Sequence, residues 1–305
     1  MKSIFSFLLP SEVAMLLGII LLLVANSVFT LPLFNPGITS LIGYLGIFVP
    51  SLLVCAVIYE YRRKKYKEQI NISEIPRNYL TFYFAIYSCM LTKHWAHLAT
   101  TKYYDDFYQK TDEWLSPLIA IEKKINSLLM IPIDYLQYMT AVQITFFFAF
   151  PVCLAGGIRL FNLCSATLVI NFIIGGFFYM AAPALGPFIY WSQDKWNATL
   201  SKYMEVTQAF IKSAGASYST TDSIFILGAM PSFHISIPAL FSWYMYKSNK
   251  FFGVIGALIT LYCFVHAQLT GFHYIIDLIA GFALATIAII IAEKMLKMRE
   301  SRRRD

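Results

Sequence analysis

Long runs of apolar residues dominate the chain and alternate with shorter polar segments. About 20 helical residues cross a hydrocarbon core about 30 Å thick, and several runs reach or approach that length. The runs are continuously apolar, which favours helices over the alternating strands of a membrane barrel. We therefore expect eight transmembrane helices, at residues 13–31, 38–59, 78–98, 136–156, 161–182, 232–247, 251–268 and 273–294.

The composition supports the same fold class. Hydrophobic residues make up 58% of the 305 residues and charged residues only 13%, whereas a soluble domain carries roughly 25% charged residues. The charged side chains are too few to cover a water-facing surface. The predicted fold class is therefore all-α, in the form of a polytopic membrane protein.

Basic residues are distributed unevenly over the predicted loops. Most of the 24 Lys and Arg fall on one face of the eight-helix arrangement, with dense groups in 60–77 and from Lys294 onwards. Because loops rich in Lys and Arg remain in the cytoplasm, we expect both termini to be cytoplasmic. The net charge of +7 thus reflects membrane topology, and no basic stripe interleaved with exposed aromatics predicts a nucleic-acid partner.

The chain divides into four predicted segments. They are an N-terminal transmembrane hairpin (1–60), a basic cytoplasmic loop (61–77), a six-helix unit (78–296) and a basic cytoplasmic tail (297–305). A cleaved secretory signal is an alternative interpretation of the first apolar run. All five cysteines fall inside predicted helices, so we expect no disulfide framework.

Two long loops on the non-cytoplasmic face interrupt the six-helix unit, at 99–135 and 183–231. The second half of the first loop is amphipathic and has Trp114 near its start, which suits a helix lying in the membrane interface. Aromatic residues in the second loop indicate that it stays close to the lipid headgroups.

One candidate site residue pair lies at the start of the last apolar run, in "TGFHYIIDLIAG". His273 and Asp277 are four residues apart and would share one face of a helix. A carboxylate there can accept the Nδ1 hydrogen of the ring, which leaves Nε2 free as a nucleophile or base. Asp277 lies about one turn inside the predicted membrane boundary, where an ionisable residue is a functional candidate by default.

A second candidate lies in "GAMPSFHISIPAL", where His234 follows Pro231 and Ser232 at the start of another apolar run. A helix N-terminus presents free N–H groups and a positive dipole end, which together hold an anion such as phosphate. Pro and Ser commonly begin helices without any such role, and each motif alone is weak. Both motifs fall at helix starts on the same predicted face, which favours one joint catalytic site.

These motifs resemble those of the type 2 phosphatidic acid phosphatase (PAP2) superfamily. "AMPSFH" resembles its second motif, and "HYIID" followed by "AG" its third. The chain looks most like the branch that includes the fungal inositol phosphorylceramide synthase and its bacterial relatives. "YMAAPALGP", with Tyr179, Pro183 and Pro187, resembles the first-motif segment of that branch, and "DDFYQKTDEWL" its acidic segment. The resemblance covers roughly 78–296 and implies a six-helix PAP2-type core.

The resemblance also implies a mechanism. His273 would attack phosphorus to form a phosphohistidine while Asp277 orients the ring. His234 would protonate the leaving oxygen and then activate the incoming water or alcohol. Ser232 and nearby backbone N–H groups would hold the phosphoryl oxygens. The superfamily needs no metal and no other cofactor for this chemistry.

The chain departs from the family pattern in its basic residues. The phosphatase-type first motif with Arg-Pro is absent, and Ala267 stands where an arginine precedes the third-motif histidine. Another cation must offset the charge on the phosphoryl oxygens, and we expect Lys93 to do so, although it could simply extend to the interface. The other candidates on that face are His94, Lys102 and Lys195.

Two other histidine roles are less favoured. His94 and His97 could suggest a metal pair, but no clear third ligand accompanies them. His266 is better interpreted as a packing residue or as a residue behind the site.

The expected function is that of a membrane phosphotransferase or phosphatase acting on lipid phosphoesters at the outer leaflet, most like an inositolphosphotransferase. Its partners would be a lipid phosphate or phospholipid donor and a lipid alcohol or water as acceptor. One alternative is a phosphatase for a lipid phosphate or a polyprenyl pyrophosphate. An alternative of another class is a non-catalytic transporter or scaffold. The scarcity of charges inside the apolar runs and the intact His234, His273 and Asp277 argue against it.

Overall fold

The computed structural model describes residues 8–29, 37–67, 71–99, 102–129, 135–190, 201, 205 and 230–304. Within these ranges the regular elements are ten α-helices and one 3-10 helix, and no strand occurs. The elements are α1 (Pro10–Phe29), α2 (Gly37–Tyr66), α3 (Glu74–Ala99), α4 (Asp105–Trp114), α5 (Ser116–Leu129), α6 (Tyr135–Gly156), α7 (Ile158–Ala181), η2 (Pro187–Tyr190), α9 (Phe233–Ser248), α10 (Lys250–Leu269) and α11 (Ile275–Arg304).

The all-helical fold confirms the predicted class, and each of the eight predicted helices has a counterpart. The amphipathic half of the 99–135 loop forms α5, as expected, whereas α4 was not predicted. In the described part of the chain, four helices are long and apolar enough to cross a membrane: Pro10–Val28, Ile158–Ala181, Lys250–Leu269 and Ile275–Ser301. Several such helices indicate an integral membrane protein.

The predicted number of eight spans is not confirmed. A fifth apolar stretch, Thr140–Gly156, is shorter than the four long ones. Helix α9 has only 16 residues, and α3 carries buried polar side chains such as Asn78 and Thr92. These two helices are stabilised by packing inside the protein, so their sequences are less apolar than those of helices that face lipid.

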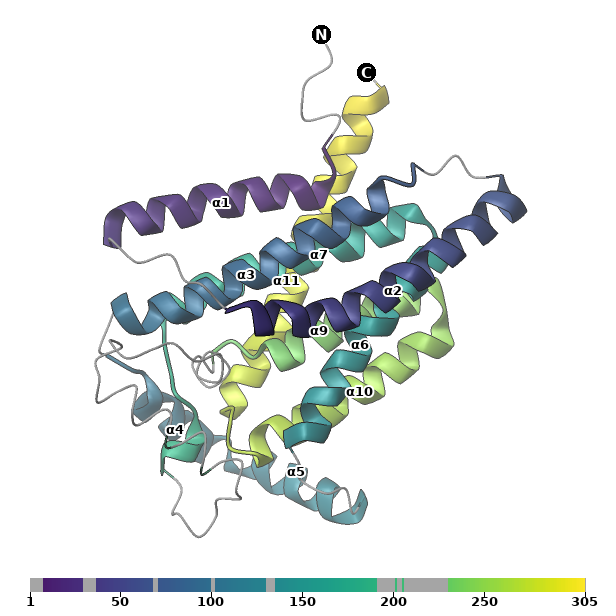
Figure 1. The fold of residues 1–305 in the computed structure, drawn as a ribbon. Helices are drawn as coiled ribbons and strands as arrows, with labels where there is room; N and C mark the ends of the chain where they lie inside the picture. Colours follow the sequence, from purple (N-terminus) through teal and green to yellow (C-terminus); the bar gives the residue numbers. More distant parts are fainter. Residues whose placement is uncertain are drawn as a thin grey trace.

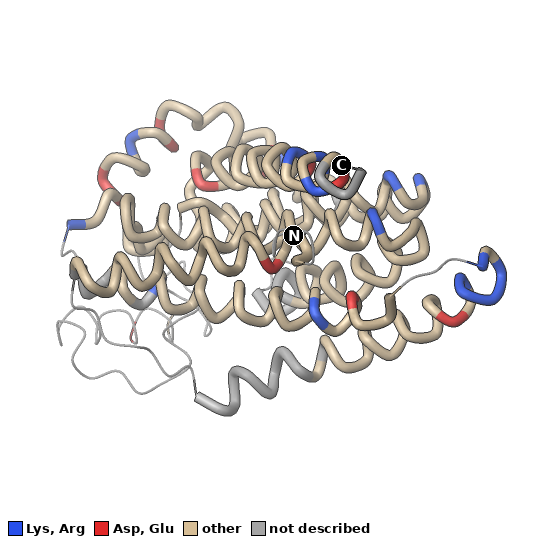
Figure 2. The backbone as a smooth tube through the Cα atoms, turned by 90° about the horizontal axis from the view of Figure 1, so that it is seen from above, with Lys and Arg blue, Asp and Glu red and all other residues tan. Residues whose placement is uncertain are grey.

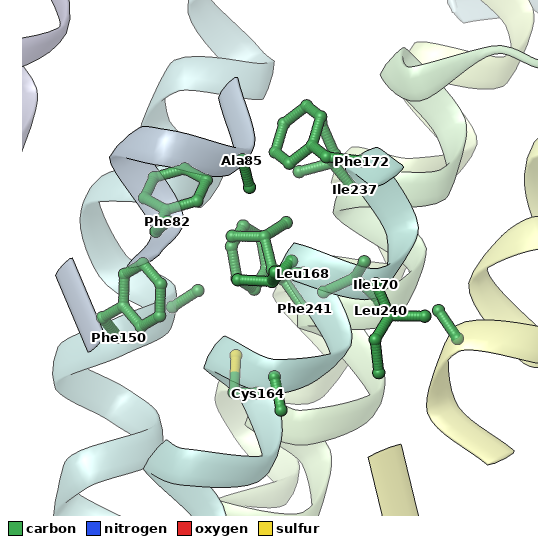
Figure 3. Packing of buried hydrophobic residues seen from close by; sticks show 14 of the residues in the cluster. Phe82, Ala85, Phe150, Cys164, Leu168, Ile170, Phe172, Ile237, Leu240 and Phe241 are labelled. Atoms are coloured by element: carbon green, nitrogen blue, oxygen red, sulfur yellow. The ribbon is translucent and has the colours of Figure 1, made fainter. Parts of the chain in front are cut away.

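Helix α7 lies in the middle of the bundle (Figure 1) and most of its side chains are buried. Around it pack α1, α3, α6, α9 and α11. Aromatic rings fill the space between these helices (Figure 3); the Phe150 ring lies 5.6 Å from Phe82 and 5.8 Å from Phe241, centroid to centroid. Such edge-to-face pairs add about 0.5–1.5 kcal/mol each to the area they bury.

A chain of buried polar groups joins α1, α3 and α7. Ser11 Oγ donates to Asn78 Oδ1 (2.7 Å), and Asn78 Nδ2 donates to Asn162 Oδ1 (2.7 Å). Asn162 Nδ2 in turn donates to Glu74 Oε2 (2.8 Å). Because unpaired polar groups in apolar surroundings are costly, this network specifies how the three helices meet. The first two helices thus pack on the bundle, α1 against α3 and α7 and α2 against α6.

The start of α1 and the end of α11 lie at the same end of the bundle (Figure 1). Most Lys and Arg positions along the backbone lie around this end (Figure 2), and the residues of the ion pairs Arg159–Glu300 and Lys247–Glu293 belong to it. Helix α4 and the connection between α10 and α11 lie at the opposite end (Figure 1). The predicted four-segment division and the side of the membrane on which each end lies remain predictions.

Candidate active site

The starts of α9 and α11 are joined directly. Ser232, the N-cap residue of α9, donates its backbone N–H to the carbonyl oxygen of Asp277 (3.0 Å). Gly281 permits this approach, because a Cβ on it would lie 2.6 Å from the Ser232 carbonyl oxygen. The two motifs, about forty residues apart in sequence, therefore meet at one place.

The two motif histidines are in direct contact. His234 Nδ1 lies 3.0 Å from His273 Nε2, and the rings meet edge to face. His273 is 4% exposed, whereas His234 is half-buried. The structure therefore brings together the two residues for which the resemblance implied the roles of nucleophile and acid.

Asp277 lies behind His273. Its Oδ2 is 3.5 Å from His273 Nδ1 and accepts a hydrogen bond from the backbone N–H of Tyr274 (2.8 Å). Asp277 is the third residue of α11 and reaches back to the residue that precedes the helix, which is one half of a capping box. The carboxylate is completely buried and fixed by the start of its own helix.

His273 and Asp277 were expected to lie on one face of the same helix, but only Asp277 is helical. Helix α11 begins at Ile275, so His273 precedes it in a turn that contains Gly271 at a φ of +78°. The His273 N–H donates to the Ala267 carbonyl oxygen (3.2 Å). The two side chains meet because Asp277 folds back over the helix start.

The contacts select one arrangement of ring protons. An ionised Asp277 carboxylate can only accept, so His273 Nδ1 carries the hydrogen that faces it. His273 Nε2 then holds a lone pair, and His234 Nδ1 must carry the hydrogen between the two rings. This arrangement gives one histidine with a free nucleophilic nitrogen and one with a proton to donate.

Within the described part of the chain, Ser232 Oγ and Asp277 Oδ1 make no hydrogen bond, and His273 Nδ1 has only its 3.5 Å contact with Asp277 Oδ2. Ser232 is completely buried, and although it is the N-cap residue its side chain makes no cap hydrogen bond. Its hydroxyl therefore remains available as a donor beside the two histidines.

Lys93 extends from α3 towards Tyr179. Its Nζ lies 4.8 Å from the centre of the Tyr179 ring. Tyr179 packs edge to face against Phe233, the neighbour of His234, with 5.2 Å between ring centroids. Tyr179 therefore lies between the expected cation and the start of α9.

Of the other candidate cations and the possible metal pair, only Lys102 has a described side chain. Lys102 Nζ lies over the Tyr104 ring at 5.6 Å from its centre. Lys195 and the side chains of His94 and His97 lie outside the described residues. His266 is buried, stacks on Tyr262 with 4.0 Å between ring centroids and has its Nδ1 3.0 Å from the Tyr262 carbonyl oxygen, which is the arrangement of a packing residue.

The acidic segment has contacts that sequence reasoning missed. Asp105 accepts hydrogen bonds from the N–H groups of Leu185 (3.0 Å) and Gly186 (2.9 Å) and from the hydroxyl of Tyr274 (2.8 Å). The Tyr104 N–H donates to the carbonyl oxygen of Pro183 (2.9 Å). The first-motif-like segment and the His273 motif are therefore joined through α4.

Pro183 and Pro187 are both buried in this region, and Pro187 begins η2. The Phe188 N–H donates to the carbonyl oxygen of Gly271 (3.0 Å), so η2 also touches the turn that carries His273. Tyr179 thus contacts the residue before His234, and the segment with both prolines contacts the turn that carries His273. The role of this segment as a first motif remains a prediction.

Three carboxyl groups of α4 and α5 are buried outside the long apolar helices. Burial raises the pKa of Asp105, although hydrogen bonds from Gly186 and Leu185 oppose the rise. Burial raises the pKa of Asp112 to about 7 despite a hydrogen bond from the Ile275 N–H. Burial, with the charge of Asp112, raises the pKa of Glu122 to about 8. Neither carboxylate oxygen of Glu122 accepts a hydrogen bond from a described residue.

A family model described as the PAP2 superfamily matches residues 113–291, which is more than half of the chain. Neither a curated protein nor a solved structure matches the chain. The matched region begins near the end of α4 and ends inside α11. It therefore contains both histidine motifs and the first-motif-like segment.

Proposed function

The chain belongs to the PAP2 superfamily, and from this premise we propose that it is a membrane phosphotransferase or phosphatase acting on lipid phosphoesters through a phosphohistidine. Membership alone indicates phosphatase or phosphotransferase activity on phosphoesters. The lipid substrate and the covalent intermediate are our proposal. The observation that carries it is the 3.0 Å contact between His234 Nδ1 and His273 Nε2, with Asp277 behind the second ring.

In the proposed first step, the phosphoryl group enters between the two rings. The lone pair of His273 Nε2 forms a bond to phosphorus as the bond from phosphorus to the leaving oxygen breaks. His234, protonated on both ring nitrogens when the substrate binds, gives its Nδ1 proton to that oxygen and becomes neutral, so the leaving alcohol also departs neutral. Asp277 stabilises the positive charge that develops on the His273 ring.

In the second step, the hydroxyl of water or of a lipid alcohol attacks the phosphorus of the phosphohistidine. Its proton passes to His234 Nδ1, and the bond from phosphorus to His273 Nε2 breaks. Ser232 Oγ would donate to a phosphoryl oxygen, and Lys93 would offset negative charge in place of the missing arginines. No residue beyond those already at the site is required.

The acceptor separates two forms of the proposal. Transfer to a lipid alcohol, as in an inositolphosphotransferase, is favoured by the resemblance of "AMPSFH" and by the absence of the phosphatase-type arginine motif. Hydrolysis of a lipid phosphate or of a polyprenyl pyrophosphate is the alternative. The active site would face the non-cytoplasmic side, because the basic residues gather at the opposite end of the bundle.

The test is lipid mass spectrometry on the purified protein in oxygen-18 water. The donors are an inositol phospholipid, phosphatidic acid and a polyprenyl pyrophosphate, each with and without ceramide or diacylglycerol. Labelled phosphate or phospho-alcohol identifies a phosphatase, and a new unlabelled phosphorylated lipid identifies a transferase. Absence of reaction with every donor would favour a scaffold or transporter that keeps only the fold.

The mechanism is tested with two substitutions of buried histidines. His273→Ala removes the nucleophile and should abolish turnover while the protein remains folded. His266→Ala removes a buried histidine on α10 that lies outside the site and should retain activity. Full activity in His273→Ala would contradict the phosphohistidine, and equal losses in both variants would mean that the loss reflects packing.

A further inference from the structure

One stripe of α4 carries all three of its buried side chains, Asp105, Tyr108 and Asp112. They are spaced at i, i+3 and i+7, which places them on one face of a helix. The remaining residues of α4 are mainly polar or exposed. Helix α4 is therefore held by a narrow contact of two carboxylates and one aromatic ring.

Each member of this stripe contacts the motif that carries His273. Asp105 accepts from the Tyr274 hydroxyl, and the Tyr108 ring lies 5.7 Å from the Tyr274 ring, centroid to centroid. Asp112 Oδ1 accepts from the Ile275 N–H (2.8 Å), at the first residue of α11. The α4 stripe thus contacts the chain immediately after His273.

Asp105 also holds the segment that precedes η2. It receives the N–H groups of Leu185 and Gly186, and Gly186 has a φ of +121°. A Cβ on Gly186 would lie 2.9 Å from the carbonyl oxygen of Phe272, so this segment lies directly against the His273 turn. One carboxylate therefore satisfies buried donors from both segments, which a neutral side chain would leave partly unpaired.

Tyr274 is consequently fixed at both ends. Its N–H donates to Asp277 Oδ2, which faces His273, and its hydroxyl donates to Asp105 Oδ1. Because Tyr274 follows His273 directly, any movement of Tyr274 changes the direction of the His273 ring. The 3.0 Å contact with His234 depends on that direction.

We propose that Asp105 is a positioning residue that holds the His273 turn against the 182–186 segment, so that His273 Nε2 faces His234. The proposal rests on the proposed function for its catalytic consequence. Its structural content, that Asp105 fixes Tyr274 and the N–H groups of Leu185 and Gly186, stands independently of any substrate.

The test compares Asp105→Asn with Asp106→Asn. Both variants lose one negative charge at neighbouring positions of the first turn of α4, but Asp106 lies at the surface, where it accepts from the Tyr190 hydroxyl. In Asp105→Asn the amide oxygen is a weaker, uncharged acceptor for the three donors that reach Oδ1, and the NH₂ that replaces Oδ2 faces the Leu185 N–H and cannot accept from it. We expect kcat to fall about 10- to 100-fold with KM changed less than about 3-fold, because displacement of a reacting group lowers the rate and not substrate binding. Asp106→Asn should retain wild-type kcat.

A smaller change tests the same contact if Asp105→Asn fails to fold. Tyr274→Phe removes only the hydroxyl that donates to Asp105, and we expect it to lower kcat by about 3- to 10-fold. In the double variant the losses should add incompletely, because Asp105→Asn weakens and Tyr274→Phe removes the same hydrogen bond. Additive losses, or a folded Asp105→Asn protein with more than about half of the wild-type kcat, would overturn the proposal.

Hydrogen–deuterium exchange separates this proposal from the proposed function. Asp105→Asn should increase exchange at the amides of Leu185, Gly186 and residues 273–277, whereas Asp106→Asn should not. Unchanged exchange in Asp105→Asn would overturn the positioning role whether or not a substrate has been found. Increased exchange together with a wild-type protein inactive on every donor would support the contact and contradict only the proposed function.

Discussion

Ser232 is a buried polar residue whose side chain is left unpaired by the described part of the chain. It is completely buried, and its hydroxyl makes no hydrogen bond to any described residue. Leaving a buried donor unpaired costs about 1–3 kcal/mol, so the side chain destabilises the folded protein in the absence of a ligand. Its position beside His234 and His273 gives a reason for this cost, since a phosphoryl oxygen would accept the bond.

Ser232→Ala should therefore lower activity without lowering the stability of the folded protein. The alanine removes the unpaired hydroxyl without enlarging the side chain, so the thermal unfolding midpoint should stay constant or rise. Turnover of the lipid donor should fall by about 10-fold or more, because a hydrogen bond to a charged phosphoryl oxygen is lost. Loss of both stability and activity would mean that the hydroxyl supports the fold instead.

At the level of single residues, the sequence was sufficient to predict that the two histidine motifs meet but not which groups support them, and the catalytic roles remain predictions. His234, His273 and Asp277 could be found because each lies at the start of an apolar run, where polar residues are conspicuous. Asp105 and Asp112 could not be assigned a role from the sequence, because a buried acid in a mainly polar helix looks like a solvated one. Their partners are backbone N–H groups from distant segments, which no side-chain pattern reveals.

The geometry of the site depends on the close packing of α9 against α11. The two helices approach so closely at Gly281 that a Cβ there would lie 2.6 Å from the Ser232 carbonyl oxygen and 3.1 Å from Ile235. Gly281→Ala should push the helix starts apart, destabilise the protein by about 1–3 kcal/mol and weaken the Ser232–Asp277 backbone bond. Activity should fall with it.

The matched control for this substitution is Gly46→Ala in α2. A Cβ at Gly46 meets nothing within 4 Å, so the same change in a helix should preserve activity and stabilise the helix slightly. Thermal unfolding and donor turnover of both variants provide the measurement. Equal unfolding midpoints and equal turnover in the two variants would contradict the prediction, because the site would then not need close packing of α9 against α11.

The stability of the folded protein should depend on pH through Glu122, a buried residue of α5. Burial raises its pKa from 4.5 to about 8, and the facing carboxyl of Asp112 adds to the rise. The folded protein then binds this proton at pH values where the unfolded chain has lost it. Stability should therefore fall as the pH rises from about 4.5 to about 8.

This prediction is tested by comparing unfolding midpoints at about pH 6 and about pH 9, where the wild-type protein should unfold at a lower temperature at the higher pH. Glu122→Gln, which carries no ionisable proton, should show a smaller difference. Glu113→Gln removes an exposed carboxylate from the neighbouring helix and should keep the wild-type difference. An unchanged pH effect in Glu122→Gln would assign it to other groups.

For the elements as a whole, continuous apolar runs were enough to predict the eight long helices. They did not predict α4, whose ten residues are mostly polar and whose position depends on three side chains. The number of spans was also not accessible from the runs, since α3 and α9 owe their helical structure to packing inside the bundle. Helix propensity and hydropathy predict that a segment is helical, but they do not show whether lipid or other helices surround it.

The two ends of the helical bundle carry different kinds of polar residues. One end carries the ion pairs that join α7 and α9 to α11 and the basic end of α2, and the other carries buried carboxylates and the two histidines. Excess Lys and Arg mark the cytoplasmic side of a membrane protein. The site should therefore open on the non-cytoplasmic side.

Cysteine labelling in intact cells tests this orientation with little background, because all five native cysteines are free and buried. Lys110→Cys places a thiol on the exposed surface of α4, and Ser301→Cys places one near the exposed end of α11. A membrane-impermeant maleimide should modify the first in intact cells and the second only after permeabilisation. The reverse result would place the histidine pair in the cytoplasm, and the lipid donor would then have to come from the inner leaflet. Labelling of both thiols in intact cells would mean that the two ends of the bundle do not lie on opposite sides of the membrane.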